Sequence, residues 1–472
     1  MALVVHNTLG GKKEPFVTRE PGKAAMYVCG INPYDYCHIG HARAYVTFDV
    51  IRRYLEHLGY QAMVVQNFTD IEDNIIARAN QLGIDFRELT AKFTAAYFED
   101  MDALRILRAH QYPKATEHIP QMIRVIQGLI EKGIAYPADG DVLYAVRKLP
   151  AYGALSGRTP DAMLAGARVE KDVKKHDPLD FVLWKTAKPG EPSWESPWGP
   201  GRPGWHIECS AMALEYLGNH FDIHGGGEDL VFPHHENEIA QSDGYTGEPP
   251  FARYWLHNAL LNLRREKMSK SVGNIETIRS VIGRVGPDVL RLYLLSAHYR
   301  TQIEYGPESL DEAKAALDRL RVARETALRL AARPEQPGSD SAASAALAGA
   351  ADTADSAFHA AMEDDFNTPQ ALAALYSLAR DLHQHGSGAN AQALTRAAEE
   401  LADCAGLLGI ELESPATRDG QVTADLIGLL VRIRAMAREA KQFAIADTIR
   451  QQLADLGIVL EDHAEGTSWR WK

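Results

Sequence analysis

Cysteine is scarce in this chain of 472 residues, which contains only Cys29, Cys37, Cys209 and Cys404. The wide and irregular separations exclude the disulfide framework that holds small secreted domains together. We therefore expect each cysteine either to be buried as a small apolar residue or to bind a metal.

Long hydrophobic runs and an excess of positive charge are also missing. No stretch approaches the ~20 apolar residues of a membrane helix, and the first apolar run is too short for a secretory signal. We therefore expect a cytoplasmic protein with no membrane association. The net charge of −13, from 63 acidic and 50 basic residues, excludes a basic coat of the kind that binds nucleic acids generally. Local basic patches that recognise a structured RNA are still compatible with it.

The segment INPYDYCHIGH at 31–41 follows an apolar run at 24–29 and precedes a helix-patterned run at 42–57. Such a junction of strand, turn and helix is where doubly wound sheets bind nucleotides, because the helix N-terminus presents free N–H groups to phosphate. Gly40 would let the backbone approach a ligand, and the two histidines would add donors. A chance strand-to-helix turn explains the same four-residue pattern, so both interpretations stay open here.

A second pattern, KMSKS at 267–271, places two lysines three residues apart among serines. A cationic loop of this kind is suited to holding a polyphosphate, although a solvated basic loop has the same composition. Together, the HIGH sequence at 38–41 and the KMSKS sequence resemble the two signatures of class I aminoacyl-tRNA synthetases.

The remaining patterns predict the fold. A strand at 61–68 should be followed by a helix from about Ile71, capped by Thr69 and Asp70. Strand, helix and strand in succession imply a parallel sheet. Downstream we expect short strands in an insertion at 134–204, a helix at 307–333, a linker at 334–344, helices centred near 355, 375 and 400, a loose stretch at 413–421, two further helices and an apolar, aromatic end.

The predicted fold class is therefore α/β: a Rossmann-type parallel-sheet catalytic domain split by an insertion, followed by an α-helical bundle and a small C-terminal domain. The boundaries that we predict are 1–112 and 205–262 for the catalytic domain, 113–204 for the connective insertion, 263–306 for the KMSKS loop and stem-contact region, 307–412 for the bundle, and 422–472 for an anticodon-binding domain, the last by analogy with the family.

A possible metal site lies between the two signatures. His234 and Glu238 are four residues apart on a predicted helix, and Cys29 and Cys209 fall at carboxyl-end positions of the predicted sheet. Two thiolates, an imidazole and a carboxylate form a ligand set typical of Zn²⁺. On spacing alone, a His–Glu pair on a helix is more often a surface hydrogen bond, and a cysteine such as Cys29 is more often a buried apolar residue.

Longer segments make the resemblance more specific. MYVCG at 26–30, GRPGWHIECSAM at 201–212, HFDIHGGGEDLVFPHHENEIAQS at 220–242 and REKMSKSVGN at 265–274 resemble segments of bacterial cysteinyl-tRNA synthetases. The similarity runs nearly end to end and includes GTSWRWK at the carboxyl terminus.

The resemblance implies ATP, L-cysteine and tRNA(Cys) as substrates, one Zn²⁺ per chain, Mg²⁺ with ATP, and a monomer. Zinc would bind the substrate thiolate far better than the hydroxyl of serine. The residues implied are the zinc ligands Cys29, Cys209, His234 and Glu238; the catalytic residues His38, His41, Lys267 and Lys270; the ATP contacts Ile31, Asn32, Tyr34, His38, Gly40, His41 and Lys270; and the cysteine contacts Gly30, Thr69, Trp205 and Asp229.

Several residues keep a second interpretation. We expect Cys37 and Cys404 to be structural and His235 to point away from the metal, whereas His206 and His224 could line the pocket or form structural hydrogen bonds. Asn32-Pro33 and Asn74 depart from the family pattern, in which Thr-Val and Lys are usual.

Two alternative functions remain at this point. One is the cysteine ligase of mycothiol synthesis, which shares the catalytic domain but lacks the extended carboxyl-terminal region. The other is a non-catalytic, tRNA-binding paralogue, which would have no need of both signatures and the ligand set.

Overall fold

The computed structural model describes residues 2–166, 174–263, 276–333, 341–413, 415–463 and 466–471. The chain divides into two compact units, Met1–Ile410 and Glu411–Lys472, which are treated separately below. Lys267 and Lys270 fall outside the described residues, as does most of the expected linker. Among the helices that are described, none combines the length and the apolar character that crossing a membrane requires.

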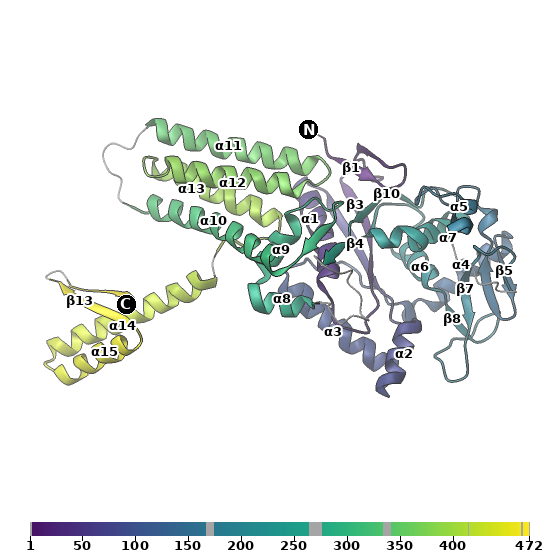
Figure 1. The fold of residues 1–472 in the computed structure, drawn as a ribbon, viewed down its shortest axis with the longest axis horizontal. Helices are drawn as coiled ribbons and strands as arrows, with labels where there is room; N and C mark the ends of the chain where they lie inside the picture. The colour runs from purple at the N-terminus through teal and green to yellow at the C-terminus, as the bar shows by residue number, and fades with distance from the viewer. Residues whose placement is uncertain are drawn as a thin grey trace. The chain divides into compact units, whose positions relative to one another are not determined.

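A four-stranded parallel sheet forms the centre of the first unit (Figure 1). Its strand order is β10-β9-β3-β4, from β3 (Lys23–Ile31), β4 (Gln61–Phe68), β9 (Phe221–Gly227) and β10 (Ala252–Asn258). Helix α1 (Ile39–His57) connects β3 to β4. From β3 the chain proceeds to β4 on one side, whereas β9 and β10 extend the sheet on the other. The carboxyl ends of β3 and β9 therefore flank a topological switch point, where parallel sheets bind ligands.

Helices and a short hairpin surround this sheet. They are α2 (Asp73–Leu82), α3 (Phe86–Ala103), α4 (Ile119–Glu131), α6 (Trp205–Leu217), α7 (Glu236–Thr246) and the hairpin of β1 (Val4–Asn7) and β2 (Lys12–Pro15). The predicted cap of α2 was wrong. The helix begins after Glu72, and the Asp70 carboxylate instead accepts hydrogen bonds from the backbone N–H and the hydroxyl of Thr116, at 2.9 and 2.6 Å.

The expected insertion is a separate antiparallel sheet between β4 and β9 in the sequence. It has the order β5-β6-β7-β8, from β5 (Ala135–Ala138), β6 (Asp141–Tyr144), β7 (Phe181–Thr186) and β8 (Gly201–Pro203), and it carries the short helix α5 (Pro160–Gly166). Trp184 on β7 is fully buried and belongs to the same hydrophobic cluster as Tyr27 and Val65 of the central sheet, so the insertion shares the core of the first unit.

A helical bundle completes the first unit. The parallel pair β11 (Leu261–Leu263) and β12 (Ile303–Tyr305), together with α8 (Ile278–Val285) and α9 (Pro287–Leu295), leads into α10 (Pro307–Ala331), α11 (Ser341–Glu363), α12 (Thr368–His385) and α13 (Ala391–Leu407). The helices expected near 355, 375 and 400 are confirmed.

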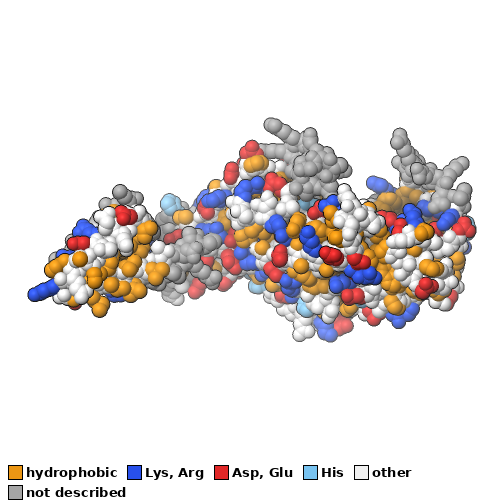
Figure 2. All heavy atoms as spheres, turned by 90° about the horizontal axis from the view of Figure 1, so that it is seen from below, with side chains coloured by type: hydrophobic (Ala, Val, Ile, Leu, Met, Phe, Trp, Pro, Cys, Tyr) orange, Lys and Arg blue, Asp and Glu red, His pale blue; other side chains and the backbone are white. Residues whose placement is uncertain are grey.

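The second unit contains α14 (Pro415–Glu439), α15 (Phe443–Asp455) and an antiparallel hairpin of β13 (Ile458–His463) and β14 (Gly466–Trp471). The loose stretch expected at 413–421 was wrong, because α14 begins at Pro415, a residue that is favourable at the first helical position. The core of the unit is small and is built on Ile427, Leu453, Ile458 and Leu460. Figure 2 shows that many hydrophobic side chains of this unit stay on its surface.

Candidate metal centre and nucleotide crevice

Four buried side chains from different elements converge at the carboxyl end of β3. Cys29 is buried two residues before the end of that strand, and Cys209 is buried in α6. Glu238 lies in the first turn of α7, and His234 lies in the kinked segment Val231–His235 before it, where Phe232 has an extended backbone. The helical spacing predicted contact between His234 and Glu238, and Nε2 lies 3.0 Å from Oε1 although His234 precedes the α-helix.

The geometry of these four residues fits a metal ion. The two sulfur atoms are 3.9 Å apart, and the Cys29 sulfur lies 3.7 Å from Glu238 Oε1. One donor atom from each of the four residues lies within 4.8 Å of the others. A set of two soft sulfur donors, one imidazole and one carboxylate suits Zn²⁺ better than Mg²⁺ or Ca²⁺, which prefer oxygen.

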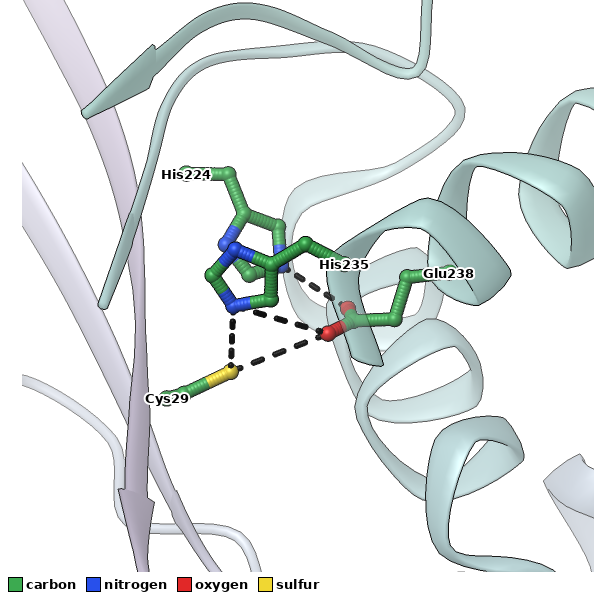
Figure 3. Close-up of side chains that lie close together, drawn as sticks. All are labelled: Cys29, His224, His235 and Glu238. Carbon is green, nitrogen blue, oxygen red and sulfur yellow. Dashed lines mark hydrogen bonds and ion pairs between the residues drawn. The ribbon is translucent and has the colours of Figure 1, made fainter. Parts of the chain in front are cut away.

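A second donor set overlaps the first. It keeps Cys29 and Glu238 and replaces the other two residues with His224 and His235 (Figure 3). His235 Nε2 lies 3.2 Å from the Cys29 sulfur, so the expectation that His235 points away was wrong. His235 and His234 lie three and four residues before Glu238, and both spacings place a side chain on the same face of a helix as Glu238, so the two consecutive histidines can both face the cluster.

Charge in the cluster is concentrated on Glu238. Burial alone would raise the pKa of this carboxyl, but His224, 2.8 Å away, and His234 lower it to about 2. In return, although burial opposes it, the Glu238 carboxylate raises the pKa of His234 to about 10. A hydrogen bond from Cys29 lowers the pKa of Cys209 to about 6, whereas burial raises that of Cys29. One thiolate and one carboxylate are therefore favoured even before a cation binds.

Neutral aromatic side chains enclose the cluster. Burial lowers the pKa of both His206 and His257 to about 3. His206 Nδ1 lies 2.9 Å from the Nδ1 of His234, and His257 Nε2 lies 2.8 Å from the Nδ1 of His235. His257 also reaches Thr8 Oγ1 at 2.8 Å. Thr8 and His257 are far from every motif in the sequence, so no local pattern could have identified them.

The HIGH turn forms the N-terminus of α1. His38 is the N-cap: its Nδ1 accepts from Gly40 N–H at 3.1 Å, while its backbone N–H donates to His41 Nδ1 at 3.1 Å. The two rings stack with centroids 3.8 Å apart. These bonds hold both imidazoles at the end of the helix where anions bind.

The chain just beyond the KMSKS sequence runs along this turn. Ile39 N–H donates to the Glu276 carbonyl at 3.2 Å, and Ile278 N–H donates to the Cys37 carbonyl at 2.9 Å. Cys37 is buried, as expected of a structural residue. The chain that follows the KMSKS sequence is therefore hydrogen-bonded to the HIGH turn, although the two lysines themselves lie outside the described residues.

The other candidate contacts lie near the same strand end. Gly30 donates to Asn67 Oδ1 at 2.9 Å, and Asn67 in turn donates to the hydroxyl of the buried Thr69 at 3.2 Å. The exposed ring of Trp205 lies 4.4 Å from that of His234. Of the remaining candidates, Ile31 is buried, Asn32 and Tyr34 are half-buried, and Asp229 is exposed.

Comparisons with known proteins identify the family. Residues 15–315 match the class I (C) tRNA synthetase catalytic domain, 357–413 match the DALR domain, and 428–470 match the cysteinyl-tRNA ligase anticodon binding domain. The cysteine–tRNA ligase of Desulfitobacterium hafniense is 49% identical over 477 residues, covering 100% of both chains. That of Thioalkalivibrio sulfidiphilus is 50% identical over 473 residues, covering 99% of both. This chain belongs to the cysteine–tRNA ligase family.

Solved structures agree on the fold of this cysteine–tRNA ligase family member. The methionyl-tRNA synthetase of Mycobacterium tuberculosis aligns with a TM-score of 0.62 at 17% identity, covering 82% of this chain and 89% of the other. A leucyl-tRNA synthetase from Agrobacterium radiobacter aligns with a TM-score of 0.61 at 11% identity, covering 83% and 84%. At these identities the likeness establishes the class I synthetase fold alone.

The two departures from the family pattern have simple local structures. Tyr34 N–H donates to the Asn32 carbonyl at 2.9 Å, so Asn32-Pro33 forms a tight turn before the HIGH sequence. Asn74 is exposed and donates to Glu72 at 3.2 Å. Neither residue contacts the metal-site candidates.

Proposed function

We propose that this chain activates L-cysteine with ATP, releasing pyrophosphate, and transfers the cysteinyl group to tRNA(Cys). The observation that supports this most strongly is the pair of buried cysteines, with His234 and Glu238, at the switch point of a class I synthetase sheet. Full-length similarity to cysteine–tRNA ligases supports the same activity. The similarity includes the anticodon-binding region, which the mycothiol-type ligase is expected to lack.

In the first step the cysteine carboxylate attacks the α-phosphorus of ATP. Gly40, His38 and His41 bind the phosphates at the N-terminus of α1, and Lys267 and Lys270 stabilise the charge that develops on the pyrophosphate. Mg²⁺ accompanies the nucleotide. Ile31, Asn32 and Tyr34 contact the nucleotide along the turn before the HIGH sequence.

Gly30, Thr69, Trp205 and Asp229 bind the amino acid beside this turn. Asn67 positions two of them, because it accepts from the Gly30 backbone and donates to the Thr69 hydroxyl. In the second step, the terminal ribose hydroxyl of the tRNA attacks the aminoacyl-adenylate, so no enzyme nucleophile is required.

Selection of cysteine over serine depends on one zinc ion per chain. Cys29, Cys209, His234 and Glu238 would hold it, and the bound ion supplies an affinity for thiolate that a neutral hydroxyl does not match. A pocket that relied on packing alone would discriminate such similar substrates by only about 1–3 kcal/mol.

The domain roles follow the predicted boundaries. Residues 1–112 and 205–262 form the catalytic domain, 113–204 the connective insertion, 263–306 the KMSKS and stem-contact region, and 307–412 the bundle. Residues 422–472 read the anticodon. We propose that the enzyme acts as a monomer in the cytoplasm.

The test is cysteine-dependent exchange of pyrophosphate into ATP, followed by transfer of labelled cysteine to tRNA(Cys), with zinc quantified in the same preparation. Exchange with transfer is expected. Exchange without transfer would favour the amino-sugar ligase, and tRNA binding without exchange would favour the non-catalytic paralogue.

A further inference from the structure

A fully buried arginine joins four elements of the first unit at one point. Arg291 in α9 pairs with the buried Asp49 of α1, with Nη2 and Oδ2 2.5 Å apart. The same guanidinium donates to the carbonyl of Leu104 at 2.9 Å and to that of Leu408 at 2.8 and 3.1 Å. Leu104 is the C-cap of α3 and Leu408 the C-cap of α13, so one side chain caps two helices while it pairs with a third.

Further charges extend this contact. Asp49 also pairs with Arg53 at 2.8 Å and accepts from Leu107 N–H at 2.8 Å. A short distance away, Asp288 of α9 pairs with Arg105 and with Arg321 of α10. We call Arg291, Asp49, Arg53, Asp288, Arg105 and Arg321 the arginine seam. The negative C-terminal ends of the two capped helices help to balance its excess of positive charge.

The fit depends on the planar shape of the guanidinium. A lysine would keep the charge but could not donate in three fixed directions at once. The seam is also tightly packed: a Cβ added at Gly409 would lie 2.1 Å from Arg291 Nη2. Gly409 has a φ of +68° and directly follows the C-cap of α13.

The arginine seam joins the helix that begins at the proposed nucleotide site to the last residues of the first unit. Helix α1 begins at the HIGH turn, so Asp49 lies on the same rigid helix as the proposed phosphate contacts. Gly409 and Ile410 are the last residues of the first unit, and the chain continues into residues 428–470, which match an anticodon-binding domain.

We propose that Arg291 is a positioning residue for transfer to tRNA. It fixes the last residues of the first unit, after which the chain continues into the anticodon-binding unit, against the helix that begins with the HIGH turn. This inference rests on the proposed function. It assigns no contact with substrate to Arg291. Loosening the seam should therefore spare cysteine activation and impair the use of a full-length tRNA.

The main variant is Gly409→Ala, which wedges a methyl group against the guanidinium and leaves every charge in place. Gly133→Ala is the matched control: Gly133 also follows a helix C-cap, has a φ of +67° and has no atom within 4 Å of an added Cβ. Arg291→Lys is a second variant, which keeps the positive charge and removes the planar guanidinium.

Three rates are measured for each variant: cysteine-dependent pyrophosphate exchange, transfer to full-length tRNA(Cys), and transfer to an acceptor-stem minihelix without an anticodon. For Gly409→Ala and Arg291→Lys we expect exchange and minihelix transfer within about twofold of wild type, and kcat/KM for full-length tRNA at least tenfold lower. Gly133→Ala should leave all three unchanged.

An equal fall in all three rates would overturn the proposal, because it would reveal a general loss of folded enzyme. Unchanged use of full-length tRNA by Gly409→Ala would also overturn it, whatever the fate of Arg291→Lys. Absence of exchange in the wild-type protein would instead contradict the proposed function.

Discussion

Replacing Cys209 with serine distinguishes the two overlapping donor sets, because Cys209 belongs only to the first. Structural zinc sites bind their ion with about 10–16 kcal/mol, so each of four ligands contributes about 3 kcal/mol on average. Since about 1.4 kcal/mol corresponds to a tenfold change, Cys209→Ser should weaken zinc binding by about two orders of magnitude. His235→Gln should weaken it only about tenfold, because His235 would act on the ion through its contact with Cys29.

Chelator competition measures the affinities, and cobalt substitution gives an independent readout. If both cysteines bind the metal, Cys209→Ser should reduce the thiolate-to-cobalt absorption by about half, whereas His235→Gln should leave it intact. Cys404→Ser is the control, since this buried cysteine lies in the bundle helix α13. An unchanged cobalt spectrum in Cys209→Ser, with a large loss of affinity in His235→Gln, would refute the assignment and favour the second set.

Three further changes test other parts of the chain. Lys270→Ala should slow pyrophosphate exchange by about 10²-fold with zinc content unchanged, and a normal exchange rate would exclude its role in charge stabilisation. Gly30→Ala would place a Cβ 1.5 Å from the Asn67 carbonyl oxygen, so we expect the free energy of unfolding to fall by at least about 1–3 kcal/mol. The melting temperature should fall accordingly, and an unchanged melting temperature would contradict this packing. Burial raises the pKa of Asp243 from 3.8 to about 6, so the folded state binds the proton more tightly and stability falls as pH rises through this interval. Asp243→Asn should therefore flatten the dependence of unfolding free energy on pH across that interval, and an unaltered slope would show that another group titrates.

Local sequence patterns predicted the elements that local interactions determine. The strand at Gln61–Phe68 has the predicted bounds, because its apolar run is followed by a polar turn. The start of α14 was missed since a segment rich in Ser, Pro, Thr and Gly has weak helix propensity. Packing of Ile427 and its neighbours in the small core of the second unit supports this helix, and such packing is a tertiary effect that propensity does not include.

The candidate site shows the same division. The contact of His234 with Glu238 follows from helical spacing, and the sequence predicted it. The inward position of His235 follows from its i,i+3 spacing to Glu238, which the sequence also offered, whereas the contact of His257 with Thr8 joins residues that lie 249 positions apart. Contacts of this second kind depend on the order of strands in the sheet, which a single sequence does not reveal without a recognised family.

Helix α1 unites the two features that the proposed reaction requires. Its first turn fixes His38 and His41 through paired backbone and imidazole hydrogen bonds, and its middle carries Asp49 in the arginine seam. A helix of 19 residues transmits a displacement of one part to the other, because its backbone bonds resist bending. Under the role proposed for Arg291, the same helix positions the nucleotide site for activation and holds the end of the first unit for transfer to tRNA. If so, perturbing the seam should separate the two half-reactions, whereas perturbing the HIGH turn should impair both.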